Sequence, residues 1–227
     1  MYVSPSKKVE DFFNKYKPLF YKKGETIIRA SDNPQGVNCI LKGYVRLYSL
    51  NKDGLEFTLN IFKPGSYFPV MWAIGGEDNR YYYEALTPVE IRRAPKKDLL
   101  LFIKNNPGVL YELTKRIISG LRGLVIRMEQ LLLGDAKEKV GTTLFLLAKR
   151  FGEKNGGQKI IIMLPMTHQG IAGLSGLSRE TTSLEMKKLE REGIISKHNR
   201  HIVINKMRKL KPNSSGYTKG GQLPHSL

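Results

Sequence analysis

A long helical repeat between residues 107 and 133 limits most strongly what this chain can fold into. Pro107 suits the first turn of a helix, and apolar residues then recur at spacings of three and four. One stripe consists of Leu113, Ile117, Leu121, Leu124, Met128 and Leu131. A second stripe consists of Leu110, Ile118, Val125 and Leu132.

A helix with two apolar stripes needs two packing partners. We expect one partner to be the preceding domain of the same chain. The other is expected to be a second copy of the chain, with the first stripe forming the contact as in a coiled-coil homodimer. The alternative is a central helix buried within one monomer.

From about residue 19 to residue 94, before this helix, the sequence has the residue pattern of a β-protein. Short runs of β-branched and aromatic residues alternate with the turn signals "SDNPQG", "NKDG" and "KPG". This pattern predicts a series of hairpins that form a small antiparallel barrel or sandwich. A helix over 6–16, with Ser6 as a possible N-cap, precedes it, and another helix begins just after Pro95.

Gly134 and Asp135 interrupt the helical pattern after the long repeat. Glycine can end one helix and aspartate can cap the next, so we place a domain boundary and hinge here. A helix over 136–151, a Gly-rich turn, a strand over 159–164, two short helices and a hairpin are expected to follow.

The charge of the chain points to a polyanionic partner. Lysine and arginine number 38 against 20 acidic residues, which gives a formal charge of +18, and the excess is denser in the C-terminal part. Cys39 is the only cysteine, so there is no disulfide framework, and we expect a buried, inert thiol. No signal peptide or apolar run of membrane-spanning length is visible, which favours the cytoplasm and no membrane partner.

Residues 167–191 have the pattern of a helix-turn-helix. Thr167 precedes a short helix, Gly176 lies in the tight turn "SGL", and Ser178 is placed to cap a second helix. At 100° per residue the second helix has an inward arc, which contains Thr182, Met186 and Leu189. Its outward arc, at the N-terminal end, contains Arg179, Glu180, Ser183 and Leu184.

The outward arc carries the chemistry that reads base edges. The Arg179 fork can bond guanine O6 and N7, and Glu180 can accept from cytosine N4. Ser178 and Thr181 are placed for phosphates, while Lys187 and Lys188 add non-specific attraction. A basic hairpin that carries Lys197, His198, Arg200 and His201 supports this interpretation as a second phosphate contact. The alternative is a helical hairpin with a solvated charged face.

The run "MTHQGIAGLSGLSRETTSLEMKKLEREGII" resembles the DNA-binding domain of the CRP/FNR family, the cyclic-AMP-receptor-like transcription regulators. The order of barrel, long helix and "GDAKEKVGTTLFLLAKRFG" is also similar, so the resemblance covers roughly residues 15–206. It implies an α+β fold with a cyclic-nucleotide-binding-type β-barrel, a dimerisation helix and a winged helix-turn-helix. The implied divisions are a sensor domain at 1–106, a dimerisation helix and hinge at 107–134, a DNA-binding domain at 135–210 and a disordered tail at 211–227.

The resemblance also implies the residues that contact double-stranded DNA. Arg179 and Glu180 would read bases, and Leu184 stands where the cyclic-AMP-type member has a second base-reading arginine. Leucine cannot donate to guanine but can touch a thymine methyl group. The full expected set is Thr167, His168, Gln169, Ser178, Arg179, Glu180, Thr181, Ser183, Leu184, Lys187, Lys188, Lys197 and Arg200.

The sensor domain departs from the cyclic-nucleotide binders of that family. Pro69 and Val70 stand where a Gly-Glu pair would hold the ribose, and Tyr81 follows Arg80 where Ser or Thr would hold the phosphate. The resemblance therefore implies a degenerate pocket. Aromatic side chains could line a pocket for an apolar or planar effector, or they could simply fill the barrel. The candidate pocket set is Phe68, Trp72, Arg80, Tyr81 and Tyr83.

We expect no metal and no cofactor. All four histidines follow residue 134, so the sensor offers no imidazole for haem, and Cys39 alone cannot hold an iron–sulfur cluster. No catalytic constellation is present, so the chain is not expected to be an enzyme. The sequence predicts a homodimeric, sequence-specific transcription regulator on a palindromic promoter site, with RNA polymerase as a further partner if it activates. The rival interpretation is a ligand-binding module that acts through protein contacts.

Overall fold

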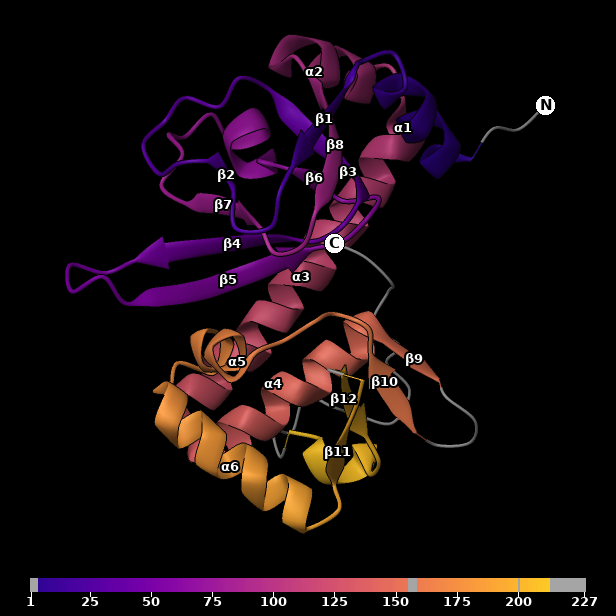
Figure 1. The fold of residues 1–227 in the computed structure, drawn as a ribbon. Coiled ribbons are helices and arrows are strands. Elements are labelled where there is room, and N and C mark those ends of the chain that lie inside the picture. Colours follow the sequence, from indigo (N-terminus) through magenta and orange to yellow (C-terminus); the bar gives the residue numbers. More distant parts are fainter. Residues whose placement is uncertain (1–3, 155–158, 200, 213–227) are drawn as a thin grey trace. The chain divides into compact units, whose positions relative to one another are not determined.

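The computed structural model describes residues 4–154, 159–199 and 201–212. By its internal contacts the chain forms two compact units, and the division falls between Ile118 and Ser119. This point lies inside the helix α3 (Pro107–Leu133), so each unit contains part of that helix (Figure 1). The division therefore differs from the hinge expected at Gly134–Asp135, because the C-terminal part of α3 makes its contacts with the helices that follow it.

The first unit is a β-structure with helices on one side. Its helical elements are α1 (Pro5–Phe13), η1 (Met71–Gly75), α2 (Lys96–Lys104) and the first part of α3. Its strands are β1 (Pro18–Tyr21), β2 (Thr26–Ile28), β3 (Val37–Lys42), β4 (Val45–Leu50), β5 (Glu56–Phe62), β6 (Tyr67–Phe68), β7 (Tyr82–Ala85) and β8 (Val89–Ala94). The hairpin series expected from the sequence is confirmed.

Two antiparallel sheets of four strands each build this unit, in the orders β1-β8-β3-β6 and β2-β7-β4-β5. Their facing sides share one apolar core, to which both sheets contribute large side chains such as Ile91, Phe68 and Tyr83. The tight turn between β3 and β4 requires Gly43. Its φ is +84°, and a Cβ atom there would lie 2.2 Å from the Pro88 carbonyl oxygen.

A second core lies between the helices and the outer side of the first sheet (Figure 1). Phe12 of α1 stacks on Phe102 of α2 with ring centroids 4.3 Å apart. The cap of α1 lies two residues earlier than expected, because Ser4 and not Ser6 accepts from a backbone amide, that of Lys7 at 3.3 Å. The start of α2 after Pro95 is confirmed.

Leu113 corrects one part of the expected dimer stripe. Its side chain is only 3% exposed and lies in the core formed with α1 and α2. At 100° per residue Leu113 lies about 80° around the helix from Leu121, which is enough to turn it toward its own unit. The helical period alone groups Leu113 with Leu121, whereas the packing assigns Leu113 to the core of the first unit.

The remaining residues of both stripes are largely exposed, so α3 is not a helix buried within one monomer. They merge into a single apolar face, because the two stripes are offset by less than a quarter turn. Leu131 is half-buried. The exposed members are Leu110, Ile117, Ile118, Leu121, Leu124, Val125, Met128 and Leu132.

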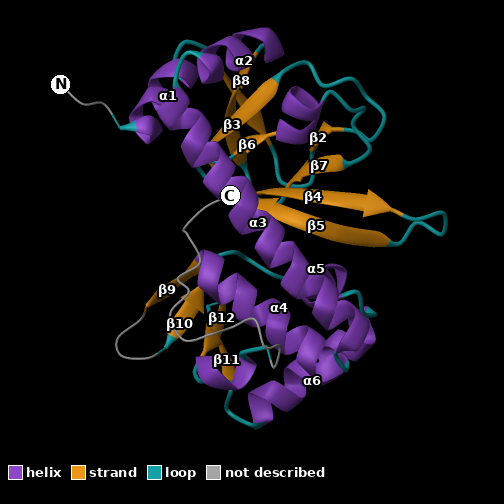
Figure 2. Cartoon of the chain, turned by 180° about the vertical axis from the view of Figure 1, so that it is seen from behind, coloured by secondary structure: helices purple, strands orange, loops and turns teal. Residues whose placement is uncertain are grey.

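The second unit combines three helices after α3 with a small antiparallel sheet of order β11-β12-β10-β9 (Figure 2). Its elements are α4 (Ala136–Phe151), β9 (Gly152–Lys154), β10 (Ile160–Ile162), α5 (His168–Ser175), α6 (Arg179–Arg191), β11 (Ile195–His198), β12 (His201–Ile204) and η2 (Met207–Leu210). The helices α4, α5 and α6 and the hairpin lie where the sequence predicts them, the strand expected over 159–164 is shorter, and the sequence did not predict β9 or η2. The expected Gly-rich turn at 155–158 and most of the expected disordered tail, residues 213–227, lie outside the described residues.

Among the residues that the structure describes, no helix is both long enough and apolar enough to cross a membrane.

The position of Leu113 yields a first prediction. Leu113→Ala should lower the free energy of unfolding by about 2–5 kcal/mol, because it opens a cavity in the sensor core. It should leave the oligomeric state unchanged. Urea unfolding at fixed protein concentration and light scattering measure the two effects. Leu121→Ala, on the exposed face, is the matched control and should lower the free energy of unfolding by less. If Leu113→Ala weakens the oligomer under conditions where the chain is fully folded, this assignment is contradicted.

Candidate nucleic-acid interface

The helix-turn-helix is built from local capping bonds. Thr167 caps α5 by accepting from the Gly170 amide at 3.0 Å, and Ser178 caps α6 by accepting from the Thr181 amide at 3.1 Å. Between them Gly176 ends α5 with φ +63°, a left-handed conformation that favours glycine. The three caps fix where α5 stops and where α6 starts, as the sequence predicts.

One face of α6 is buried against its own unit. The inward arc, Thr182, Met186 and Leu189, is at most 2% exposed. Ile194 and Ile195, which follow the helix, are also buried. This confirms the rotation of α6 that the helical geometry predicts. Burial of these apolar side chains sets which residues remain outside.

The opposite face of α6 is open at its N-terminal end. Arg179 and Glu180 are exposed, and Leu184 is 60% exposed although it is apolar. Among the residues that the structure describes, neither charged side chain has a hydrogen-bond or ion-pair partner. A guanidinium, a carboxylate and an apolar side chain are therefore presented together from the first turns of one helix.

Ser183 behaves differently from the rest of the outward arc. It is half-buried, and its hydroxyl lies 2.6 Å from Nδ1 of His168, the first residue of α5. These two residues of the expected DNA set thus bond to each other and tie the start of α5 to the middle of α6. Thr167, Gln169 and Ser178 of the same set are exposed.

His168 lies in a cationic environment. Burial is the largest cause that lowers its pKa, and the positive charges of Lys197, Arg179 and Lys187 lower it further, while Glu190 acts in the opposite direction. A lowered pKa favours the neutral imidazole near pH 7.

Two of the expected DNA-contacting lysines have carboxylate partners within the unit. Lys188 binds Glu185 at 2.7 Å, and Lys197 of β11 binds Glu190 at 3.2 Å. Lys187 is exposed. Sequence reasoning missed both carboxylates, although Glu185 stands three residues before Lys188, a spacing at which such pairs form on a helix. Arg200 lies outside the described residues.

The hairpin of β11 and β12 forms the expected wing. Its register pairs Ile195 with Ile204 and His198 with His201. His198 is exposed, but Nδ1 of His201 lies 3.1 Å from the Ile162 carbonyl oxygen, so His201 joins the wing to β10.

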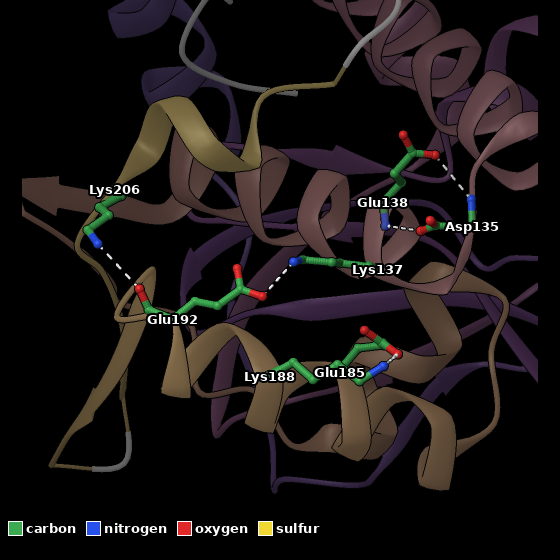
Figure 3. Close-up of polar contacts among 7 residues, drawn as sticks. All are labelled: Asp135, Lys137, Glu138, Glu185, Lys188, Glu192 and Lys206. Atoms are coloured by element: carbon green, nitrogen blue, oxygen red, sulfur yellow. Dashed lines mark hydrogen bonds and ion pairs between the residues drawn. The ribbon is translucent and has the colours of Figure 1, made fainter.

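The C-terminal end of α6 is held by lysines, as Figure 3 shows. Lys137 of α4 donates to the Glu192 carboxylate at 2.6 Å, and Lys206 donates to the Glu192 carbonyl oxygen at 3.3 Å. Cations at this end complement the helix dipole. In the same view Asp135 and Glu138 form the capping box that starts α4, which confirms Asp135 as its cap.

The five residues of the expected effector pocket lie in different parts of the first unit. Phe68 and Tyr83 are buried and stack on each other with centroids 4.9 Å apart, and Tyr81 packs in the same core. Trp72 packs in the other core, beneath Lys96, and Arg80 is exposed. Phe68, Tyr81 and Tyr83 thus lie in the core between the sheets, and the effector pocket stays a prediction.

The sensor cysteine is buried as expected. Burial raises the pKa of the Cys39 thiol to about 11, so it stays protonated near neutral pH. Across the described ranges, no group of three His, Cys, Asp or Glu side chains is placed to hold a metal ion.

Comparison with known proteins agrees with this architecture. Residues 18–106 match the cyclic nucleotide-binding domain family, and residues 138–212 match the Crp-like helix-turn-helix domain family. The global nitrogen regulator of Nostoc is 29% identical over 192 residues, covering 82% of this chain and 84% of that protein. The cAMP-activated global transcriptional regulator CRP of Pasteurella multocida is 27% identical, covering 81% of this chain and 88% of that protein.

Solved structures show the same arrangement of elements. A CRP/FNR-family transcriptional regulator from Thermus thermophilus is 25% identical with a TM-score of 0.67, covering 86% of this chain and 96% of that one. FixK2 from Bradyrhizobium japonicum is 26% identical with a TM-score of 0.73, covering 86% and 95%.

A two-sheet sensor unit followed by a winged helix-turn-helix defines a transcription regulator with a DNA-binding domain. The chain belongs to the CRP/FNR family. The fold and the relatives are those of transcription regulators and not of enzymes.

The surroundings of His168 yield a pH prediction. Since its pKa in the folded chain is lowered from 6.5, the unfolded chain binds more protons as the pH falls through that value. Stability should therefore decrease with falling pH in this window. An NMR titration should place the His168 midpoint below 6.5. In urea unfolding, the stability of His168→Gln should depend less on pH than that of the wild type. A His168 titration midpoint at or above 6.5 would contradict the burial argument.

Proposed function

We propose that this chain is a cytoplasmic, homodimeric transcription regulator that reads a palindromic promoter site with α6 of each copy. The observation that carries the proposal is the exposed face of α6, where Arg179, Glu180 and Leu184 stand opposite a fully buried face. A helix so anchored can enter the major groove with its N-terminal residues at the base edges.

Each exposed side chain has a distinct partner in this proposal. Arg179 bonds guanine, Glu180 accepts from cytosine, and Leu184 contacts a thymine methyl group. Phosphates are held by the capped helix starts at Thr167 and Ser178, together with Gln169, Thr181 and His168. Lys187, Lys188 and Lys197 add sequence-independent attraction, which gives the affinity its salt dependence.

We further propose that cyclic nucleotides are not the effector. Pro69 and Val70 provide no ribose carboxylate, since neither side chain can accept a hydrogen bond. Arg80 is exposed, and the neighbouring aromatic side chains fill the core. Any effector-driven change would reach α6 through α3 and the residues that follow it.

In-vitro selection from random duplexes tests the reading of bases. The wild-type protein should return a palindrome, and Leu184→Ala should lose its thymine preference at one position per half-site. Arg179→Ala should cost about 1–3 kcal/mol of discrimination at its guanine. Arg191→Ala, at the far end of α6, is the matched control and should select the wild-type motif.

Repeating the selection with cyclic AMP should change neither the selected motif nor the affinity for it.

The proposal of sequence-specific reading fails if wild-type protein selects no motif, or if the Arg179 and Leu184 variants keep every base preference.

The homodimer is proposed from the exposed apolar face of α3. Eight large apolar side chains on one helix face are a surface that monomers rarely expose. Leu121→Glu combined with Met128→Glu should convert the dimer into a monomer, because paired carboxylates would be buried at the contact. Light scattering measures the mass. Arg122→Glu, exposed elsewhere on the helix, is the control and should remain dimeric; a doubly substituted chain that stays dimeric would place the contact elsewhere.

A further inference from the structure

A half-buried arginine joins the last part of α3 to the helix-turn-helix. Arg127 donates from Nη2 to the carbonyl oxygen of Leu174 at 3.2 Å. Leu174 is the penultimate residue of α5, and only three residues lie between it and Ser178, the cap of α6. Both partners belong to the second unit.

We infer that Arg127 is a positioning residue of the DNA reader, which holds the α5–α6 turn at a fixed place on α3. The inference rests on the proposed reading of DNA by α6. Arg127 does not touch DNA in this role. It acts through Leu174 and the turn, and so determines where the base-reading side chains of α6 are presented.

The chemistry of the bond suits a fixed joint. The last carbonyl groups of a helix carry partial negative charge and lack partners within the helix. A hydrogen bond from a guanidinium to such a carbonyl oxygen is stronger than one between neutral groups, and its geometry is directional. Burial lowers the pKa of Arg127 to about 10, which still leaves it charged at neutral pH.

A second bond from the same stretch of α3 reaches α4. Gln130, three residues after Arg127, accepts from the Thr142 hydroxyl at 3.3 Å. The three helices meet around a small, partly open hollow, which is lined by Lys139, Thr143 and Ser175 and by the apolar side chains of Leu131 and Leu174. The hydrogen bonds of Arg127 and Gln130 therefore give this part of α3 directional contacts to both α5 and α4.

The position of the turn matters because base readout is sensitive to geometry. A bidentate pair between an arginine and guanine needs both N–H groups aligned with O6 and N7. Attraction to phosphates is long-ranged and tolerates displacement. Loss of Arg127 should therefore weaken specific binding more than non-specific binding.

Three variants of the full-length protein test the inference: Arg127→Ala, Arg127→Lys and Arg122→Ala. The last removes an exposed arginine of the same helix and is the matched control. Binding is measured by fluorescence anisotropy on the selected operator and on a scrambled duplex, across a series of salt concentrations. Circular dichroism identifies a temperature at which every variant is folded, and binding is measured at that temperature.

Arg127→Ala should bind the operator about tenfold or more weakly, as expected for a lost hydrogen bond of a charged group. Its affinity for the scrambled duplex and its salt slope should stay at wild-type values. Arg127→Lys, which keeps one donor, should recover part of the loss, and Arg122→Ala should keep the wild-type preference for the operator.

Three results would overturn the inference. One is unchanged operator binding by Arg127→Ala. Another is an equal loss on both duplexes, which indicates general destabilisation. The third is a salt slope lowered by about one, which indicates a direct phosphate contact. Failure of the wild-type protein to prefer any operator would instead refute the proposed function.

Discussion

The burial of one face of α6 is the interaction on which the proposed reading of DNA by this protein depends. Thr182, Met186 and Leu189 are held inside the second unit, and a helix has only one rotation that satisfies all three. That rotation places Arg179 and Leu184 outside without any further constraint on them. The apolar core thus determines the direction of polar side chains that take no part in it.

Electrostatics inside the unit divide the cations into two groups. Lys188, Lys197 and Lys137 bind carboxylates of the unit and help to orient its helices and wing. Such exposed pairs contribute little stability each, and a polyanion can compete for their lysines. Arg179 has no such partner among the described residues and is available to a base. The total of 38 lysine and arginine residues therefore overstates how many cations are available to a ligand.

Features set by neighbouring residues were predictable from the sequence, and those set by distant contacts were not. Asp135, Thr167 and Ser178 cap helices because of bonds to amides three residues away, so their roles are visible in a short window. Leu113 fits the same periodicity as Leu121, and only the packing of the sensor shows that the two face different partners. The bonds of Arg127 to Leu174 and of His168 to Ser183 link residues far apart in sequence, so no local sequence pattern predicts them.

The match of the sensor unit to a domain family does not by itself assign a ligand to this chain. Residues 18–106 match the cyclic nucleotide-binding domain, and two sheets enclose a core as that match implies. Recognition of a charged sugar phosphate requires particular polar groups at particular places. Here Phe68 and Tyr83 occupy the core between the sheets, and Pro69 and Val70 follow where polar partners would be needed. Since apolar side chains stabilise the two sheets without a ligand, the architecture can persist while the chemistry of its effector changes.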